Sequence, residues 1–172
     1  MMENDDEEFG TALVKGHRLR KLFNQILTML AFIGPGSGFR VLCNRLKGAR
    51  IGEHCWIGDN VTIDIHYAHP DRANSLKISH HVAIGPGVRI FTHDTSSAQV
   101  SMGRKPVKFR KVSIGEHTWI GAGSVVANCS IGKHCIIAPN SLVTTDVPDY
   151  TLAMGVPADN RKDIKSRARG PE

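Results

Sequence analysis

The sequence predicts an all-β fold, a β-solenoid of short stacked strands that follows an N-terminal helical segment. Three observations predict it. Aliphatic residues recur at every sixth position, glycine follows many of them, and only 6% of the 172 residues are aromatic. A six-residue period is too short for a helical hairpin or a propeller blade, but it fits one flat side and one corner of a solenoid. The aliphatic positions form four blocks: Ile51, Ile57, Ile63; Ile78, Ile84, Ile90; Ile114, Ile120, Val126; and Ile131, Ile137, Val143.

The pattern inside each hexad is that of a strand. A small or β-branched residue stands two positions before each aliphatic, and residues two apart in a strand face the same side. Both are therefore expected to face inward, while the residue between them faces outward, which places Trp56 and Trp119 on the outside. Polar pairs such as Glu53-His54 mark the corners. A β-sandwich with coincidental spacing is the alternative, and twelve aliphatics on one register weigh against it.

The spacing between blocks predicts where the solenoid is irregular. Ile63 and Ile78 are fifteen positions apart, and Val126 and Ile131 only five. We expect local irregularities at both places. Ile90 and Ile114 are four hexads apart, so a loop there leaves the repeat in phase.

The flanking segments are expected to be helical or extended. Residues 16–33 predict a helix that ends at the breaker run GPGSG, and residues 37–47 predict a second short helix. The expected organisation is a flexible acidic N-terminus over 1–14, a helical segment over 15–49, a solenoid over 50–148 with a loop over 94–111, and a C-terminal extension over 149–172. In this extension, residues 149–158 are expected to leave the last coil and the basic tail 159–172 to form a short helix.

The net charge of +6 invites a nucleic-acid hypothesis. The basic residues are dispersed over three segments, however, and no nucleic-acid motif is present, so a phosphate-rich small ligand accounts better for them. The stretch FNQILTMLAFIG is too short and interrupted to span a bilayer. It is expected to pack on the solenoid or on a neighbouring subunit, and a peripheral membrane helix stays open.

The four cysteines form no zinc pattern, and Cys55 and Cys135 occupy the inward slot of the hexad. We expect reduced thiols, a cytoplasmic location and no bound metal. The N-terminus is acidic and polar, so no signal peptide is expected.

Longer segments carry a family resemblance. The repeats, together with FTHD (91–94), KPVKFRKVSIGEHTWIGAGSVV (105–126) and SLVTTDVPDYTLAMGVPA (141–158), resemble the hexapeptide-repeat acyltransferases. The branch is that of the galactoside, maltose and nodulation-type O-acetyltransferases and those of cell-surface polysaccharide synthesis. The resemblance covers about 50–158. It implies a left-handed parallel β-helix, a homotrimer, an active site between subunits, and acetyl-CoA as co-substrate in the groove between two solenoids.

Acyl transfer to a hydroxyl needs a base beside the nucleophile and donors for the oxyanion. The resemblance assigns the base to His93, which stands just before the loop. Asp94 is a poor partner for it, because adjacent strand residues face opposite sides. Asp64 is the second catalytic candidate: it aligns with an acceptor-contacting Asn of the galactoside enzymes, and it would hold the acceptor hydroxyl or orient His93 across subunits. Four other histidines share one corner slot and are expected to be turn residues, since no carboxylate accompanies them as a metal site would need: His54, His81, His117 and His134.

The resemblance also places the ligands. Trp119 matches the Trp beside the pantetheine arm, and a backbone N–H near Ala122 is the candidate oxyanion donor. The other cofactor-binding positions are Gly123, Pro139, Asn140 and Thr144. Thr145 and Asp159 stand where relatives carry Lys and Arg. The phosphates would therefore be met by Arg161, Lys162 and the loop residues Arg104, Lys105 and Lys108. His66 and His69 are the candidates for the acceptor pocket.

Together these features predict an acetyl-CoA-dependent O-acetyltransferase that acts on a sugar or a cell-surface glycan precursor. No Ser or Cys is placed beside a base, so direct transfer is expected. Two alternatives stay open: an N-acetyltransferase of an amino sugar or antibiotic, and a non-catalytic solenoid that binds metal through His66, His69 and His93.

Overall fold

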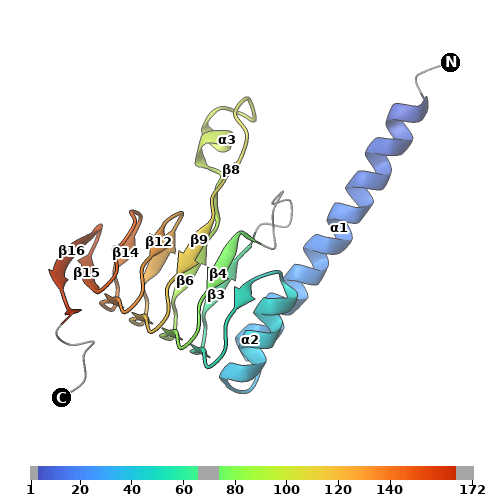
Figure 1. Cartoon of the computed structure of the whole chain (residues 1–172). Coiled ribbons are helices and arrows are strands. Elements are labelled where there is room, and N and C mark those ends of the chain that lie inside the picture. The colour runs from blue at the N-terminus through green and yellow to red at the C-terminus, as the bar shows by residue number, and fades with distance from the viewer. Residues whose placement is uncertain (1–3, 66–73, 166–172) are drawn as a thin grey trace.

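The computed structural model describes residues 4–65 and 74–165 (Figure 1). Two helices come first, α1 (Asn4–Ile33) and α2 (Gly36–Leu46), as the sequence predicted for 16–33 and 37–47. The helix α1 begins earlier than expected and includes residues 4–14, which we had expected to be flexible.

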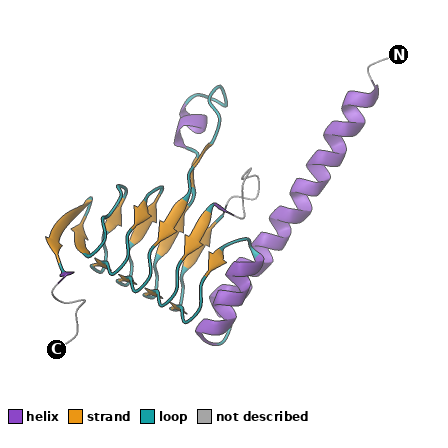
Figure 2. Cartoon of the chain, in the orientation of Figure 1, coloured by secondary structure: helices purple, strands orange, loops and turns teal. Residues whose placement is uncertain are grey.

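The body of the molecule is a three-sided coil. Successive strands join the first, second and third sheets in turn, and neighbouring strands of successive coils are parallel. The repeat-based prediction of stacked β-coils is thus confirmed (Figure 2). The first sheet contains β1 (Arg50–Ile51), β4 (Leu76–Ile78), β9 (Val112–Ile114) and β12 (Ser130–Ile131). The second contains β2 (Trp56–Ile57), β5 (Ala83–Ile84), β10 (Trp119–Ile120) and β13 (Ile136–Ile137). The third contains β3 (Thr62–Asp64), β6 (Arg89–Phe91), β11 (Val125–Ala127) and β14 (Leu142–Val143).

The aliphatic positions form the core. All twelve are buried, with at most 7% of their surface exposed, and Ile57, Ile84 and Ile120 stack in register along the second sheet. Burying a side chain of this size contributes roughly 1.5–3 kcal/mol before conformational entropy is subtracted. Trp56 and Trp119 face outward, 49% and 43% exposed, as the alternation predicted.

The helix α2 closes the N-terminal end of the stack. Strand N–H groups of one coil donate to carbonyls of the next coil, as Gly52 does to Ile78, but three carbonyls of the first coil, those of Ile51, Ile57 and Ile63, are bonded by side chains instead. Three basic side chains bond them. Arg45 donates to Ile51 O at 2.7 Å, Arg40 to Ile57 O at 3.3 Å, and Lys47, just after α2, to Ile63 O at 2.5 Å. Arg40 also pairs with Asp59. One carbonyl at the edge of each of the three sheets thereby has a partner.

One corner of the coil carries a ladder of rings. His54, His81, His117 and His134 all adopt the left-handed conformation, with φ between 53° and 56°. Their rings stack with centroids 4.8–5.0 Å apart, and Tyr150 continues the stack at 4.9 Å. We call these five residues the histidine ladder. The positions lie at a turn, as the sequence predicted, and their chief contact is with one another.

The two spacing anomalies have different outcomes. Between Val126 and Ile131 the corner is made by Asn128, with φ of 58°, and Cys129 takes the inward slot. Much of the interval between Ile63 and Ile78 lies outside the described residues. The loop after Ile90 is a projecting hairpin, in which β7 (His93–Asp94) pairs antiparallel with β8 (Lys108–Phe109) and α3 (Ser96–Val100) lies at the tip (Figure 1).

The C-terminal segment differs from the expectation. Residues 149–158 were expected to leave the coil, but β15 (Thr151–Gly155) extends the second sheet parallel to β13. The chain then turns back as β16 (Ala158–Asp163), antiparallel to β15, where a short helix was expected. The antiparallel return gives the exposed edge of β15 a partner. Among the described residues, no helix combines the length and the apolarity needed to cross a bilayer.

Candidate functional site

His93 and Asp64 lie together at the end of the third sheet. The strands β3 and β6 pair so that Asp64 is opposite Phe91, and His93 follows two residues later. Thr92 fixes this turn, because its hydroxyl donates to Asp64 O at 3.1 Å. His93 Nε2 lies 3.9 Å from Asp64 Oδ2, and the two side chains are 13% and 46% exposed. Both residues belong to one chain, so an arrangement in which Asp64 acts on His93 across subunits is not needed.

The pair opens into a pocket of about 700 Å³, which we call the His93 pocket. One wall is α1, and the opposite wall is the end of the third sheet. The helix is held there by Asn24, whose side-chain amide donates to Ile65 O at 3.4 Å. The lining residues are Lys21, Asn24, Gln25, Thr28, Met29 and Phe32 of α1, with Lys47, Asp64, Ile65 and His93.

Asp94 forms its hydrogen bond within the loop that follows it. Its carboxylate accepts a hydrogen bond from the Ser96 N–H at 2.8 Å. Hydrogen bonds from the Ser96 side chain and backbone lower the pKa of Asp94, and the charges of Lys108 and His93 add to this effect. This agrees with the expectation that Asp94 is not the partner of His93.

The predicted cofactor positions lie along another edge, where the second and third sheets meet. Trp119 projects from β10, and Ala122 and Gly123 form the corner that follows. Gly123 has φ of +71°, and a Cβ there would collide with the Asn140 side chain of the next coil. The Ala122 carbonyl accepts a hydrogen bond from Asn140 N at 2.9 Å. We call these four residues the Ala122 edge.

The backbone of this edge has a specific property. Pro86, Ala122 and Pro139 occupy the same corner in three successive coils, and among these three only Ala122 has an N–H group. Among the backbone hydrogen bonds of the described residues, Ala122 appears as an acceptor and not as a donor. The stack therefore leaves this N–H available to a ligand.

The remaining candidates are scattered. Pro139 is exposed beside the Ala122 edge, Thr144 is exposed at the end of β14, level with Ala127 of β11, and Lys162 is exposed on β16. Lys105 is exposed in the loop, where its backbone N–H is bonded to Ser101 Oγ at 2.9 Å. The backbone of Arg161 lies in β16 and its side chain is outside the described set, as are His66 and His69 altogether.

The candidates thus divide into two groups. None of the cofactor candidates, including Trp119 and Ala122, lines the His93 pocket. A site that needs both groups requires the Ala122 edge of one chain to approach the His93 pocket of another. Within the described parts of the chain, no group of three or more His, Cys, Asp or Glu side chains is arranged to hold a metal ion.

The contribution of α1 to the His93 pocket was missed by the sequence analysis. A signal existed, because Lys21, Gln25 and Thr28 are spaced at i, i+4 and i+7 and place polar groups on one side of the mainly apolar C-terminal part of the helix. Lys47 was missed as well, and nothing in its sequence context distinguishes it from a surface lysine.

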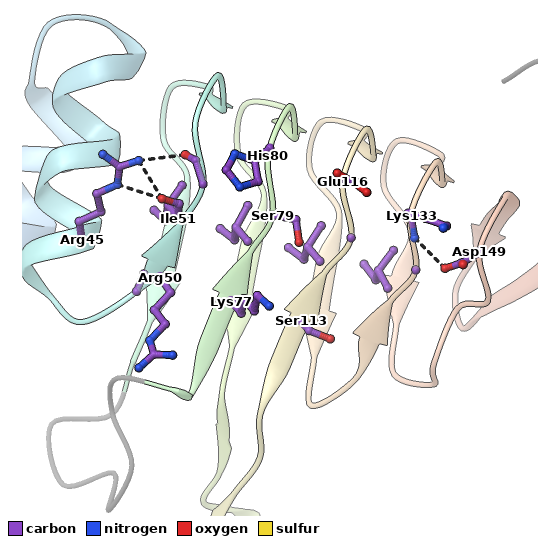
Figure 3. A pocket seen from close by; sticks show the side chains of 17 residues that line it. Arg45, Arg50, Ile51, Lys77, Ser79, His80, Ser113, Glu116, Lys133 and Asp149 are labelled. Atoms are coloured by element: carbon purple, nitrogen blue, oxygen red, sulfur yellow. Dashed lines mark hydrogen bonds between the residues drawn. The ribbon is translucent and has the colours of Figure 1, made fainter. Parts of the chain in front are cut away.

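A second, open groove of about 830 Å³ covers the first sheet (Figure 3). Its labelled side chains come from successive coils, with Arg50, Lys77 and Ser113 on the strands. Arg45 bonds Ile51 O and Gly52 O at its N-terminal end, and Lys133 N bonds Asp149 Oδ1 at 2.9 Å at its other end. This groove shares no lining residue with the His93 pocket.

Known proteins resemble this chain in sequence. A family model described as bacterial transferase hexapeptide (six repeats) matches residues 111–145. A galactoside O-acetyltransferase of Lactococcus lactis is 33% identical over 138 residues, which cover 67% of this chain and 63% of that protein. Nodulation protein L of Rhizobium meliloti is 32% identical over 133 residues, covering 75% and 68%. The chain spans 63% and 54% of the first two curated relatives it matches.

A solved structure has the same fold. A hexapeptide-repeat-containing acetyltransferase from Vibrio cholerae superposes with a TM-score of 0.66 at 23% identity, over 87% of this chain and 93% of that one. The same acetyltransferase complexed with acetyl coenzyme A matches with a TM-score of 0.61 at 18% identity, over 86% and 88%.

Proposed function

This chain belongs to the hexapeptide-repeat acyltransferase superfamily, and from this premise we propose that it is an acetyl-CoA-dependent O-acetyltransferase for a sugar or a cell-surface glycan precursor. The observation that carries the proposal is the pairing of His93 with Asp64 in a pocket large enough for a sugar. Galactoside O-acetyltransferase is the printed name of two relatives, which supports a sugar hydroxyl as the acceptor class.

The gap between the two side chains suits a hydroxyl group. With 3.9 Å between His93 Nε2 and Asp64 Oδ2, an oxygen can lie about 2.8 Å from both atoms, a normal hydrogen-bond distance. His93 Nε2 would take the hydroxyl proton while Asp64 helps to hold the acceptor. In this tautomer the other proton is on Nδ1, which is buried inside the protein. His93 is therefore the general base of the proposal and Asp64 its acceptor-holding partner.

The transfer step balances without a covalent intermediate. The acceptor oxygen forms a bond to the thioester carbonyl carbon, and its proton passes to His93. The tetrahedral oxyanion accepts a hydrogen bond from the Ala122 N–H. The carbon–sulfur bond then breaks, and His93 returns the proton to the thiolate. The products are an O-acetyl ester and the free thiol of CoA.

Acetyl-CoA would lie along the Ala122 edge. The indole of Trp119 is exposed there, and Gly123 allows close approach, while Pro139, Asn140 and Thr144 continue the surface. Basic side chains such as Lys162 and Lys105 would meet the phosphates. The structure of the Vibrio protein with acetyl coenzyme A bound supports this choice of co-substrate.

The active assembly is part of the proposal. Because the His93 pocket and the Ala122 edge do not share residues in one chain, we place the site between two subunits of a homotrimer of left-handed β-helices. The four cysteines are free thiols, and three of them donate to backbone carbonyls, which suits a reducing, cytoplasmic setting.

The first experiment is an acceptor panel. Purified protein is incubated with acetyl-CoA and either neutral glycosides or nucleotide-linked amino sugars, and release of free CoA thiol is followed. We expect thiol release with hydroxyl acceptors and an ester in the product. Release only with amino sugars would favour N-acetylation, and no release from any acceptor, together with stoichiometric metal in the protein, would favour the metal-binding solenoid.

A mixing experiment tests the position of the site. His93→Ala and Ala122→Pro variants, each of low activity, are unfolded together, refolded and assayed as mixed trimers. A site between subunits regains one intact copy in mixed trimers, so activity should recover to a sizeable fraction of the wild-type value. Activity that stays at the level of the separate variants would place the whole site in one chain.

A further inference from the structure

The helix α1 has three distinct faces along the part whose side chains the structure describes. At about 100° per residue, Asn24, Leu27 and Ala31 point to one side, and all three are buried. Lys21, Gln25 and Thr28 follow around the helix and line the His93 pocket. The remaining side is apolar and exposed. We call it the outer face, and it consists of Leu19, Leu22, Phe23, Ile26 and Ile33.

The outer face is large and continuous. Its residues are 70%, 53%, 50%, 45% and 68% exposed in that order, and they run for about 20 Å along the helix. No residue from 22 to 39 is charged, and none of the five residues of the outer face is polar. Single exposed apolar residues are ordinary, whereas a continuous row of this kind marks an interaction surface.

The charges around this row indicate what it contacts. Arg20 is exposed at its N-terminal end, on its flank, and the sequence carries two more basic residues just before it, Lys15 and Arg18. An apolar helix face beside a basic cluster is typical of helices that lie on anionic lipid. The acidic run 5–8 is about 16 Å or more from Leu19 along the axis, beyond the Debye length of about 8 Å at physiological salt.

We propose that α1 lies on an anionic lipid surface through its outer face. A contact with a second copy of the chain would also bury the apolar row, but it would not account for the cations at its end. The lipid surface accounts for both, because acyl chains receive the apolar side chains and headgroups receive the basic ones.

The geometry has a consequence for the acceptor, which rests on the proposed function. Met29 and Phe32 line the His93 pocket and are themselves 58% and 52% exposed, so apolar surface continues from the outer face to the pocket rim. With α1 on the lipid, the pocket opens beside the headgroups. The acceptor that fits this position is a glycan anchored to the membrane by a lipid.

Vesicle sedimentation of the full chain tests the docking without using activity. The probes are vesicles of phosphatidylcholine alone and of phosphatidylcholine mixed with phosphatidylglycerol. We expect binding to the anionic vesicles, weaker binding to the neutral ones, and a decrease with salt. The double variant Phe23→Glu/Ile26→Glu should bind at least about tenfold more weakly, and Arg20→Gln should mainly reduce the preference for anionic lipid.

Val100→Glu is the matched control, because Val100 is also an exposed apolar residue, 86% exposed on the loop far along the chain from α1. It should sediment like the wild type. The docking is overturned if the wild type binds no vesicles, or if the double variant binds as well as the wild type. It is also overturned if light scattering shows that the double variant falls apart into smaller species, since the outer face would then be a subunit contact.

A second assay separates docking from catalysis. The best soluble sugar from the panel is compared with the same sugar joined through a phosphate to a long-chain alcohol in anionic vesicles. The double variant should keep its turnover on the soluble sugar and lose it on the vesicle-borne one. Equal loss on both would refute the lipid-anchored acceptor. A chain that binds vesicles and acetylates no acceptor would leave the docking standing and overturn the proposed function.

Discussion

Two groups of histidines in this chain make a useful comparison. Those of the histidine ladder recur at one corner of each coil, share one backbone conformation and stack on each other. His93 lies outside the six-residue register, is 13% exposed, and lies beside the Asp64 carboxylate in the wall of a pocket. A residue type that repeats in every coil satisfies a structural requirement of the coil, here the left-handed backbone at the corner. A residue outside the repeat is not constrained by the coil and can be placed to contact a ligand.

The same contrast holds at the Ala122 edge. Pro86 and Pro139 repeat a corner that needs no N–H, while Ala122 between them supplies one. The departure is a single backbone hydrogen, and it lies where the proposed thioester would be. Substitutions at the repeated positions and at His93 and Ala122 test whether the two kinds of residue have different roles.

The largest effect is expected for His93→Ala. Loss of a general base lowers turnover by about two to four orders of magnitude, while the unfolding midpoint should change little because the side chain is not part of the core. Steady-state thiol release measures the effect. The matched control is His117→Asn, which removes an imidazole from the ladder, tolerates φ of 55°, and should leave turnover near the wild-type value. Equal losses in both variants would remove the distinction between the two groups.

Ala122→Pro is expected to have the next largest effect. The corner already accepts proline in the coils on both sides, so the fold should survive, but the N–H is lost. Removal of one oxyanion donor lowers kcat by about a hundredfold or more. The KM for acetyl-CoA should change far less than kcat. Ala122→Ser, which keeps the N–H, is the control, and a similar loss of kcat in that variant would contradict a backbone role.

The third prediction concerns stability. His117→Val forces a β-branched residue into the left-handed region and removes two ring contacts, so the free energy of unfolding should fall by about 1–2 kcal/mol. His117→Asn should cost less, since Asn is tolerated in that conformation. Urea unfolding measures both. If Val and Asn were equally costly, the stacked rings rather than the backbone would determine the choice of residue.

The smallest effect concerns Cys129, which occupies an inward slot and is 2% exposed. Burial raises the pKa of its thiol to about 11, above the ordinary value of 9.0. Because the folded pKa is the higher one, the stabilisation is complete below about pH 9 and is lost as the pH rises through 11. The free energy of unfolding should fall over this range, by on the order of 1 kcal/mol, less steeply in Cys129→Ala than in the wild type. Parallel slopes would show that other groups dominate the alkaline loss.

The sequence predicted the parts of the fold that repeat. The buried column from Ile51 to Val143 follows from period and alternation, since each coil imposes the same choice on the same position. The sequence did not predict that α1 forms a wall of the His93 pocket. The angle between this helix and the solenoid depends on tertiary contacts such as that of Asn24 with Ile65 O. The return strand β16 was missed because ADNRKD has no strand alternation, and its pairing with β15 alone makes it a strand.

The three basic side chains at the N-terminal end of the solenoid cap the stack of coils. A stack of parallel strands has no intrinsic length, since every new coil presents the same donors and acceptors as the last, and an open end could recruit a coil from another molecule. With Arg45, Arg40 and Lys47 on the carbonyls of Ile51, Ile57 and Ile63, that end offers no vacant acceptor at these three positions. Coils inserted or deleted in the middle of the solenoid would leave this N-terminal end unchanged. The length of such a protein can therefore vary while its N-terminal end stays unable to pair with another molecule at these three carbonyls.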